Sequence, residues 1–325
     1  MQNQIKIFSS QNWSDYSLMD TGGGEKLEQF GKYTFVRPCE DAIWPKTLSQ
    51  KEWDNADGKF FSSKDGTKAG WKISKISRVA LDIKWIIEYK GIKFFASPTP
   101  FRHLGFFPEQ ASHWDFIEKK IKESFSQKRN SPVLLHPSDG TFRPENFSSV
   151  SRPKFLNLFG YTGVASLFAL RAGAEITHLD ASKQILKWAK ENQKLNSPLG
   201  LDKLPMRIIE DDAIKFLERE IKRGNKYDAV IIDPPKFGRG PKGEVWKIEE
   251  KLSKLLSLVP KVLSDKPLFV ILTSYATDSS SLSLGYALSE VMKDFHGKVE
   301  QGELCVLENS NNRFIPLANT AVWSA

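Results

Sequence analysis

An acid, two prolines, a lysine and an aromatic residue form the segment of this sequence whose chemistry stands out most. The segment is the pentapeptide Asp233-Pro234-Pro235-Lys236-Phe237, and a continuous apolar run precedes it. Such a run is typical of a strand buried on both faces. Because proline has a carbonyl acceptor but no backbone N–H, the loop suits a planar group that donates hydrogen bonds. An ordinary turn at a strand end has the same local pattern, so other strand ends must decide between the two interpretations.

A glycine turn upstream offers a place for a ligand. Gly160 and Gly163 bound the turn Gly160-Tyr161-Thr162-Gly163, which follows a short apolar run. Residues without side chains let a ligand approach the backbone, and the amides that begin a helix favour a carboxylate or a phosphate. A Gly-x-x-Gly pattern is weak evidence when it stands alone.

Acidic residues end the next two expected strands. Asp180 is the last residue of the second strand, where an acid commonly accepts hydrogen bonds from a ribose diol. Asp211 and Asp212 follow the third strand, where a carboxylate can receive an adenine amino group. Each acid alone could equally cap the helix that follows it. Together with the glycine turn, these strand ends predict a site for a nucleoside cofactor.

The elements that must position these residues alternate between strands and helices from Lys154 onward. The expected strands are 155–159, 175–180, 206–209, 227–232 and 268–273, and the expected helices include 164–171, 245–263 and 282–294. Two last strands, 303–307 and 314–323, form a hairpin. Repeated strand–helix units predict an α/β, Rossmann-like, doubly wound and mostly parallel sheet, here with a C-terminal antiparallel hairpin.

The first part of the chain has a different character. Residues 1–110 contain short aromatic and β-branched runs interrupted by Gly and Pro, among them 33–36, 79–83, 85–89 and 92–96. Hairpin turns are expected at Asp65-Gly66 and at Tyr89-Lys90-Gly91. We therefore predict a smaller β-rich N-terminal domain (1–110) that could recognise the substrate, a helix and linker (111–150), and the α/β domain (151–325).

Composition restricts the class of protein further. The 325 residues carry a formal charge of +8, which suits a polyanionic partner. No apolar run is long enough to span a bilayer and the N-terminus lacks the pattern of a signal peptide, so we expect a cytoplasmic protein that does not insert in membranes. Cys39 and Cys305 are the only cysteines, too few for a disulfide framework or a zinc cluster, and no metal is predicted.

The nucleoside cofactor could be NAD or S-adenosylmethionine. The turn lacks the full Gly-x-Gly-x-x-Gly expected for a pyrophosphate. From Lys154 on, the sequence resembles class I S-adenosylmethionine-dependent methyltransferases, specifically the family that modifies bases of large-subunit (23S) ribosomal RNA. The motifs that carry the resemblance are Asn157-Leu158-Phe159-Gly160-Tyr161-Thr162-Gly163, Asp180-Ala181-Ser182, Glu210-Asp211-Asp212-Ala213, the pentapeptide and, upstream, Gly105-Phe106-Phe107-Pro108-Glu109-Gln110.

The resemblance implies a role for each matching residue. The turn would wrap the methionine end of the cofactor, Asp180 would hold the ribose, and Asp212 would meet the adenine. The implied cofactor-binding residues are Gln110, Asn157, Phe159, Gly160, Tyr161, Thr162, Gly163, Asp180, Ala181, Ser182, Asp212, Ala213 and Asp233, and the implied catalytic residues are Asp233, Pro234, Pro235 and Phe237. The arginine that follows the upstream glutamine in the family is Ala111 here.

The residues also restrict the acceptor atom. Methylation of a pyrimidine at carbon 5 needs a cysteine nucleophile, which relatives carry after the proline loop or after the fifth strand. This sequence has Pro234-Pro235 and Thr273-Ser274-Tyr275 there. A nitrogen acceptor is therefore expected, with Asp233 and the Pro234 carbonyl accepting from an exocyclic amine while Phe237 or Tyr275 stacks on the base. For Phe237, packing in the core is an equal alternative.

RNA, and ribosomal RNA first, is the expected partner. The basic loop after the pentapeptide would contact phosphates and close over the acceptor, and the expected substrate-binding residues are Lys236, Arg239, Lys242, Trp246 and Tyr275. Two alternatives stay open, an N-methyltransferase acting on a protein or a small molecule and a non-catalytic RNA-binding protein that retains the fold. The sequence gives no indication of the oligomeric state.

Overall fold

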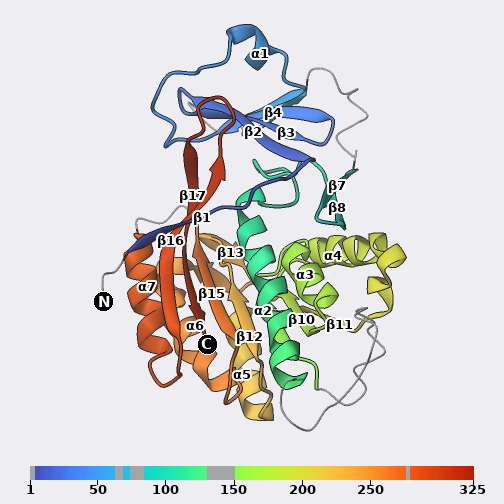
Figure 1. Cartoon of the computed structure of the whole chain (residues 1–325), viewed down its shortest axis with the longest axis vertical. Helices are drawn as coiled ribbons and strands as arrows, with labels where there is room; N and C mark the ends of the chain where they lie inside the picture. Colours follow the sequence, from blue (N-terminus) through green and yellow to red (C-terminus); the bar gives the residue numbers. More distant parts are fainter. Residues whose placement is uncertain (1–3, 63–68, 74–83, 130–150, 276–278) are drawn as a thin grey trace. The chain divides into compact units, whose positions relative to one another are not determined.

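The chain divides into two compact units. The computed structural model describes residues 4–62, 69–73, 84–129, 151–275 and 279–325 (Figure 1). The larger unit comprises His113–Glu303, Ala318–Ala325 and the start of the chain up to Lys6, and the smaller unit comprises Ile7–Ser112 and Leu304–Leu317. The expected Asp65-Gly66 turn, the expected strand 79–83 and most of the expected linker lie outside the described residues.

An eight-stranded sheet forms the centre of the larger unit, in the order β1-β16-β17-β15-β12-β9-β10-β11. Its parallel strands are β9 (Lys154–Leu158), β10 (Glu175–Asp180), β11 (Met206–Glu210), β12 (Ala229–Ile232) and β15 (Phe269–Ser274). Strand β17 (Phe314–Ser324) pairs antiparallel with β15, and β16 (Lys298–Leu307) and β1 (Ile5–Phe8) complete the sheet. The predicted fold class, a mostly parallel sheet with a C-terminal hairpin and a separate β-rich region, is confirmed.

The strand order reverses direction between β9 and β12. The chain runs outward from β9 through β10 to β11, and β12 then returns to the other side of β9. Ligands of open α/β sheets bind outside the carboxyl ends of the strands at such a reversal. Leu158 and Ile232 are neighbours in the register. The glycine turn and Asp233 therefore leave the sheet next to each other.

Helices cover both faces of this sheet. One face packs on α5 (Ala213–Arg223), α6 (Ile248–Val262) and α7 (Ser281–Val291) in a core that includes Val230 and Ile232. On the other face lie α2 (Ala111–Arg129), α3 (Val164–Arg171) and α4 (Lys183–Leu195) (Figure 1). The ring of Trp114 in α2 stacks on Phe168 in α3, with 5.6 Å between centroids. None of the described helices has the length and apolar character needed to cross a membrane.

The segment after the pentapeptide corrects one sequence prediction. The sequence predicts a single helix over residues 245–263, but α6 begins only at Ile248. The residues before it belong to an antiparallel hairpin of β13 (Phe237–Arg239) and β14 (Val245–Lys247). Glu244 closes the connecting turn, because its carboxylate accepts a hydrogen bond from the Lys242 N–H at 2.9 Å.

The smaller unit contains a five-stranded sheet and a separate hairpin. The sheet is ordered β2 (Tyr16–Gly22), β3 (Glu25–Phe30), β4 (Tyr33–Pro38), β5 (Gly58–Phe61) and β6 (Gly70–Ile73), and α1 (Gln50–Asp54) lies between β4 and β5 in the chain. The hairpin of β7 (Trp85–Tyr89) and β8 (Ile92–Ala96) turns at Lys90 and Gly91, both with positive φ. The expected Tyr89-Lys90-Gly91 turn is confirmed.

A buried ion pair lies within the five-stranded sheet. Arg37 donates two hydrogen bonds to the Glu28 carboxylate, at 2.6 and 2.7 Å, and the Tyr16 hydroxyl donates a third at 2.9 Å. Burial alone would raise the pKa of Glu28, but the positive charges of Arg37 and Lys26 lower it to about 2. Glu28 is therefore a carboxylate whose oxygens are occupied by partners inside the sheet.

Helix α2 matches the helix expected at the start of residues 111–150, and from His113 onward it is part of the larger unit. The His113 Nε2 lies 3.1 Å from the Thr320 hydroxyl of β17, which in turn donates to the Leu272 carbonyl at 3.0 Å. Because the Thr320 hydroxyl uses its proton to donate to Leu272, it must accept a hydrogen bond from His113. The proton of the imidazole is therefore on Nε2. Burial lowers the pKa of His113 to about 3, so the imidazole is neutral in the folded protein.

This buried histidine predicts a pH dependence of stability. Unfolded His113 takes up a proton below its ordinary pKa of 6.5, whereas the folded form resists protonation down to about 3. The free energy of unfolding should therefore fall as the pH is lowered from about 7 to about 5, because the unfolded state then binds more protons. His113→Gln should reduce this slope by up to about 1.4 kcal/mol per pH unit in denaturant titrations. The exposed His296→Gln serves as the control, and equal slopes for His113→Gln and wild type would contradict the assignment.

Candidate active site

The glycine turn after β9 has an unusual backbone. Phe159 and Tyr161 have φ values of 59° and 51°, and Gly163 has a φ of 86°. Residues other than glycine rarely adopt this left-handed region, and such conformations persist only where the surroundings enforce them. Gly160 has a different reason to be glycine. A Cβ atom there would lie 2.2 Å from Cε1 of His178, so the turn can sit on that ring only without a side chain.

A buried polar network holds the turn from below. His178 in β10 places Nε2 3.2 Å from the Tyr161 carbonyl and Nδ1 3.0 Å from the Ser166 hydroxyl. Asn157 in β9 donates its amide to the same hydroxyl at 2.9 Å. Burial lowers the pKa of His178 to about 4, so the neutral ring donates to Tyr161 and accepts from Ser166. Asn192 in α4 also donates to the Thr162 carbonyl at 2.9 Å.

Asp180 connects the turn to the helix that follows β10. One carboxylate oxygen accepts the Tyr161 N–H at 3.0 Å and the other accepts the Ser182 N–H at 2.9 Å. Burial raises the pKa of Asp180, against the opposing effect of these N–H donors. Since each carboxylate oxygen has two acceptor positions, the group can still receive two hydroxyl donors. That is the requirement for holding a ribose diol.

The start of α3 differs from the starts of the two helices that follow. Ser182 caps α4 by accepting the Ile185 N–H, and Asp212 caps α5 by accepting the Lys215 N–H at 3.0 Å. The N-cap of α3 is Gly163, which has no side chain to accept such a hydrogen bond. The N–H groups of its first turn are therefore open to an anionic group of a ligand.

Asp233 and the prolines lie beside this turn. The Asp233 N–H points to the Leu158 carbonyl at 3.5 Å, which continues the pairing of β12 with β9. Asp233 is half-buried and Pro234 is buried, whereas Pro235 and Lys236 are exposed. Phe237 is 55% exposed, so its ring is available for stacking and does not pack in the core.

Trp246 has a different position from the one expected. The sequence suggests contact with the substrate, but only 4% of Trp246 is exposed. Its indole N–H donates to the Pro235 carbonyl at 2.7 Å, and its ring lies 4.8 Å from that of Phe159. The physical reason is the β13–β14 hairpin, which pairs Trp246 with Gly238 and turns the indole inward. Trp246 therefore joins the proline loop to the glycine turn.

The remaining expected residues fall into separate groups. Lys236, Arg239 and Lys242 are exposed on or beside the hairpin, and Tyr275 follows β15 half-buried. Ala181 is half-buried and Ala213 is buried at the starts of their helices. Gln110 is buried within the smaller unit, so its role toward the cofactor stays a prediction.

The structure thus gathers the motifs of four strands at one edge of the sheet, the carboxyl ends of β9, β10, β11 and β12. Sequence reasoning missed His178, Ser166 and Asn192. Asn157 donates its amide to Ser166, and its expected contact with the cofactor stays a prediction. One signal was present. Asn157 and His178 are polar residues within two apolar strands, and they are neighbours in the register.

These groups together fit S-adenosylmethionine. The half-buried Asp180 carboxylate suits the ribose, and the uncapped start of α3 suits the methionine carboxylate. Gly160 lies directly on the His178 imidazole, and this contact fixes the position of the glycine turn. Asp212 uses one acceptor position of one oxygen as a helix cap, so its carboxylate can still accept from an adenine amino group.

Comparison with solved structures shows a match over nearly the whole chain. The chain resembles a SAM-dependent methyltransferase from Agrobacterium tumefaciens, with 37% sequence identity and a TM-score of 0.83 over 98% of this chain and 93% of that one. No protein-family model matches the chain.

Curated relatives match over shorter stretches. One is ribosomal RNA large subunit methyltransferase K of Neisseria meningitidis, 30% identical over 45% of this chain and 43% of the relative. Another is ribosomal RNA large subunit methyltransferase I of Aeromonas salmonicida, 39% identical over 27% of this chain and 22% of the relative. The chain thus spans less than half the length of either relative.

The Gly160–His178 contact gives a test of the cofactor site. Gly160→Ala should weaken S-adenosylmethionine binding by at least about tenfold, because a methyl group forces the turn off the imidazole. Isothermal titration calorimetry measures the affinity. Gly70→Ala is the matched control, since a Cβ at Gly70 meets no atom within 4 Å. Wild-type affinity in Gly160→Ala would show that the turn does not bind the cofactor.

Proposed function

Because this chain belongs to the S-adenosylmethionine-dependent methyltransferases, we propose that it methylates a nitrogen of an RNA base, with ribosomal RNA as the substrate. The single observation that carries the proposal is the position of Asp233 and the two prolines, beside the cofactor turn at the reversal of strand order. The names of the curated relatives support ribosomal RNA as the substrate class. Such a substrate also favours a cytoplasmic location.

The choice of nitrogen rests on the cysteines. Cys39 and Cys305 are the only two in the sequence, and both are buried. Cys39 lies after β4, Cys305 lies within β16, and neither follows β12 or β15. Burial also raises the pKa of the Cys39 thiol, which disfavours the thiolate. A mechanism that needs no covalent cysteine adduct therefore fits the chain better.

The acceptor side of the site can align an amine without bonding to it covalently. S-adenosylmethionine supplies an activated methyl group when bound. Asp233 and the Pro234 carbonyl accept the N–H groups of the amine, which directs its lone pair toward that methyl group. The proton that the nitrogen loses can pass to the Asp233 carboxylate and from there to water. The exposed ring of Phe237 covers the base and excludes water.

The hairpin supplies the expected phosphate contacts. Arg239 and Lys242 are exposed, and cationic side chains of this kind form charge-assisted hydrogen bonds with phosphate oxygens. The hairpin is tied to α5 by a hydrogen bond from the Lys215 ammonium to Glu244 at 2.6 Å. It therefore presents its basic side chains from a fixed element next to the acceptor loop.

Asp233→Ala tests the catalytic role. The variant should lose methyl transfer almost completely while binding S-adenosylmethionine within a few fold of wild type, because Asp233 acts on the acceptor. Transfer is followed with labelled cofactor on RNA from cells that lack the gene, and mass spectrometry of nucleosides identifies the product. Normal turnover by the variant would refute the assignment.

Two other results would favour the alternative functions. Activity that survives nuclease treatment of the substrate fraction would favour a protein or small-molecule acceptor. Failure of wild type to bind the cofactor would favour a non-catalytic RNA-binding protein.

A charge-matched pair of variants tests the hairpin. Replacing Arg239 and Lys242 with Ala should weaken RNA binding and reduce the slope of log affinity against log salt by about 0.7–0.9 for each phosphate that the protein no longer neutralises. Lys222 and Lys266 are exposed at the opposite, amino-terminal edge of the parallel strands, near the end of α5 and before β15. Their replacement with Ala removes the same charge and should leave the slope unchanged. An identical slope in both double variants would exclude the contact.

A further inference from the structure

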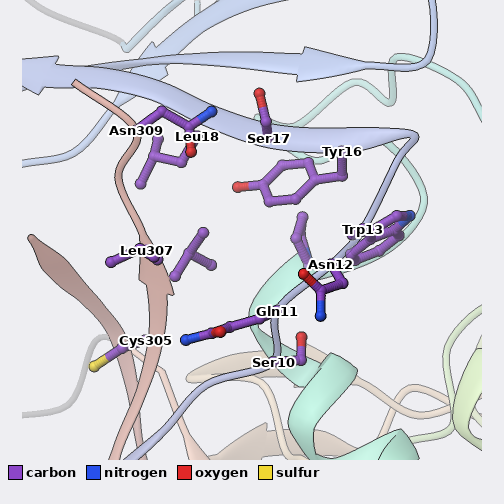
Figure 2. A pocket seen from close by; sticks show the side chains of 12 residues that line it. Ser10, Gln11, Asn12, Trp13, Tyr16, Ser17, Leu18, Cys305, Leu307 and Asn309 are labelled. Atoms are coloured by element: carbon purple, nitrogen blue, oxygen red, sulfur yellow. The ribbon is translucent and has the colours of Figure 1, made fainter. Parts of the chain in front are cut away.

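The smaller unit contains a pocket that the proposed methyl transfer does not use. It has a volume of about 270 Å³. Its twelve lining residues all belong to that unit (Figure 2). They are Ser10, Gln11, Asn12, Trp13, Tyr16, Ser17, Leu18, Pro108, Cys305, Val306, Leu307 and Asn309. The volume lies below the range of about 300–1,000 Å³ typical of sites for drug-sized ligands, so the pocket suits a smaller group.

One wall of the pocket is rigid because its aromatic residues are anchored. The Trp13 indole donates to the Glu88 carbonyl at 2.7 Å, and its ring lies 4.6 Å from Tyr89 and 5.3 Å from Tyr16. The Tyr16 hydroxyl donates to the buried Glu28, and Tyr16 itself is only 5% exposed, so it supports the Trp13 ring from behind. The half-buried Trp13 supplies the aromatic surface of the pocket. In Figure 2 the two rings lie side by side along the pocket.

The opposite wall is held just as firmly. The Asn309 N–H donates to the Leu18 carbonyl at 2.9 Å, which joins the hairpin to β2. The Ser310 hydroxyl donates to Asp20 at 2.6 Å, and Arg313 donates to the buried Glu308 at 2.7 Å. The hairpin end therefore stays fixed against β2, and the pocket is preformed.

The lining chemistry restricts the ligand. None of the twelve lining residues carries a charge. Exposed amides come from Gln11, Asn12 and Asn309, and each amide offers both donors and an acceptor. Figure 2 shows Gln11 extending toward the strand that bears Cys305 and Leu307. Asn12 has a φ of 64°, a conformation found where surroundings constrain the chain.

A pocket of this kind suits a neutral ligand that is flat and carries hydrogen-bond donors and acceptors on its edge. An anion would find no positive side chain in the lining, and a cation would find no carboxylate. Unpaired RNA bases have the required properties, since proteins recognise them by stacking on aromatic rings and by hydrogen bonds to their edges. Side-chain amides bind base edges particularly well, because they match paired donor and acceptor positions.

We propose that this pocket binds one unpaired base of the RNA substrate. The inference rests on the proposed function for the identity of the ligand, and it adds a second base-recognition site on the unit that does not carry Asp233. Affinity at this site comes from hydrogen bonds and stacking, whereas affinity at the β13–β14 hairpin comes from charge. The two contributions should therefore respond differently to salt.

Two variants test the pocket on the full-length protein. Gln11→Ala should weaken binding of single-stranded ribosomal RNA fragments by about fivefold, the effect of removing one hydrogen bond, without changing the salt slope. Leu307→Trp should fill the pocket and weaken binding by about tenfold or more, because the base can no longer stack there. Gln50→Ala is the matched control, since Gln50 is an exposed amide on α1 of the same unit and does not line the pocket. Circular dichroism spectra and thermal unfolding transitions like those of wild type would show that all variants are folded.

Nucleoside titrations separate this proposal from the proposed function. Adenosine, guanosine, cytidine and uridine are added singly while NMR follows the side-chain amide of Gln11, and at least one should shift it in wild type but not in Leu307→Trp. If wild type methylates RNA but Leu307→Trp binds RNA equally well, the pocket proposal fails and the proposed function stands. If wild type fails to methylate RNA but a nucleoside shifts Gln11, the pocket proposal stands and the proposed function fails. No shift with any nucleoside would overturn the pocket proposal.

Discussion

The contact between Gly160 and the buried imidazole of His178 is the constraint on which the rest of the site depends. A neutral histidine fills the space under the turn, and the residues on either side of Gly160 have left-handed backbone conformations. The network through Ser166 and Asn157 keeps the ring in one orientation, because every polar atom that faces it has a defined donor or acceptor role. The backbone amides and Asp180 are then held ready for the cofactor, without the entropy loss of ordering a loop on binding.

The proline loop takes its position from the same turn. Trp246 packs on Phe159 and donates to the Pro235 carbonyl, so one indole connects the residue that begins the glycine turn to the loop that carries Asp233 and the two prolines. Methyl transfer requires the donor and acceptor to be aligned closely, and small displacements are costly. A shared buried side chain coordinates two loops that come from different strands. This also explains why Trp246 is in the core although it lies in a basic, polar segment.

Much of the fold was predictable because its signals are local. The apolar runs of β9, β10 and β12 and the glycine turn mark strand–helix units, and their acidic ends lie at one edge whenever the strands are parallel. The hairpin before α6 was not predictable, because Val245 and Trp246 fit either a strand or a helix until Glu244 closes its turn. The role of His178 depends on its neighbour across the sheet, which no local pattern contains. The pocket of the smaller unit combines residues from both ends of the chain, and only the folded structure brings them together.

The two compact units are each built from separate segments of the chain. The chain passes from one unit to the other after Lys6, after Ser112, after Glu303 and after Leu317, and the last two points lie inside β16 and β17. Neither unit is therefore a contiguous stretch of sequence. Any continuous piece of the sequence that contains all of one unit also contains part of the other. The two units are therefore expected to be inherited and to evolve together.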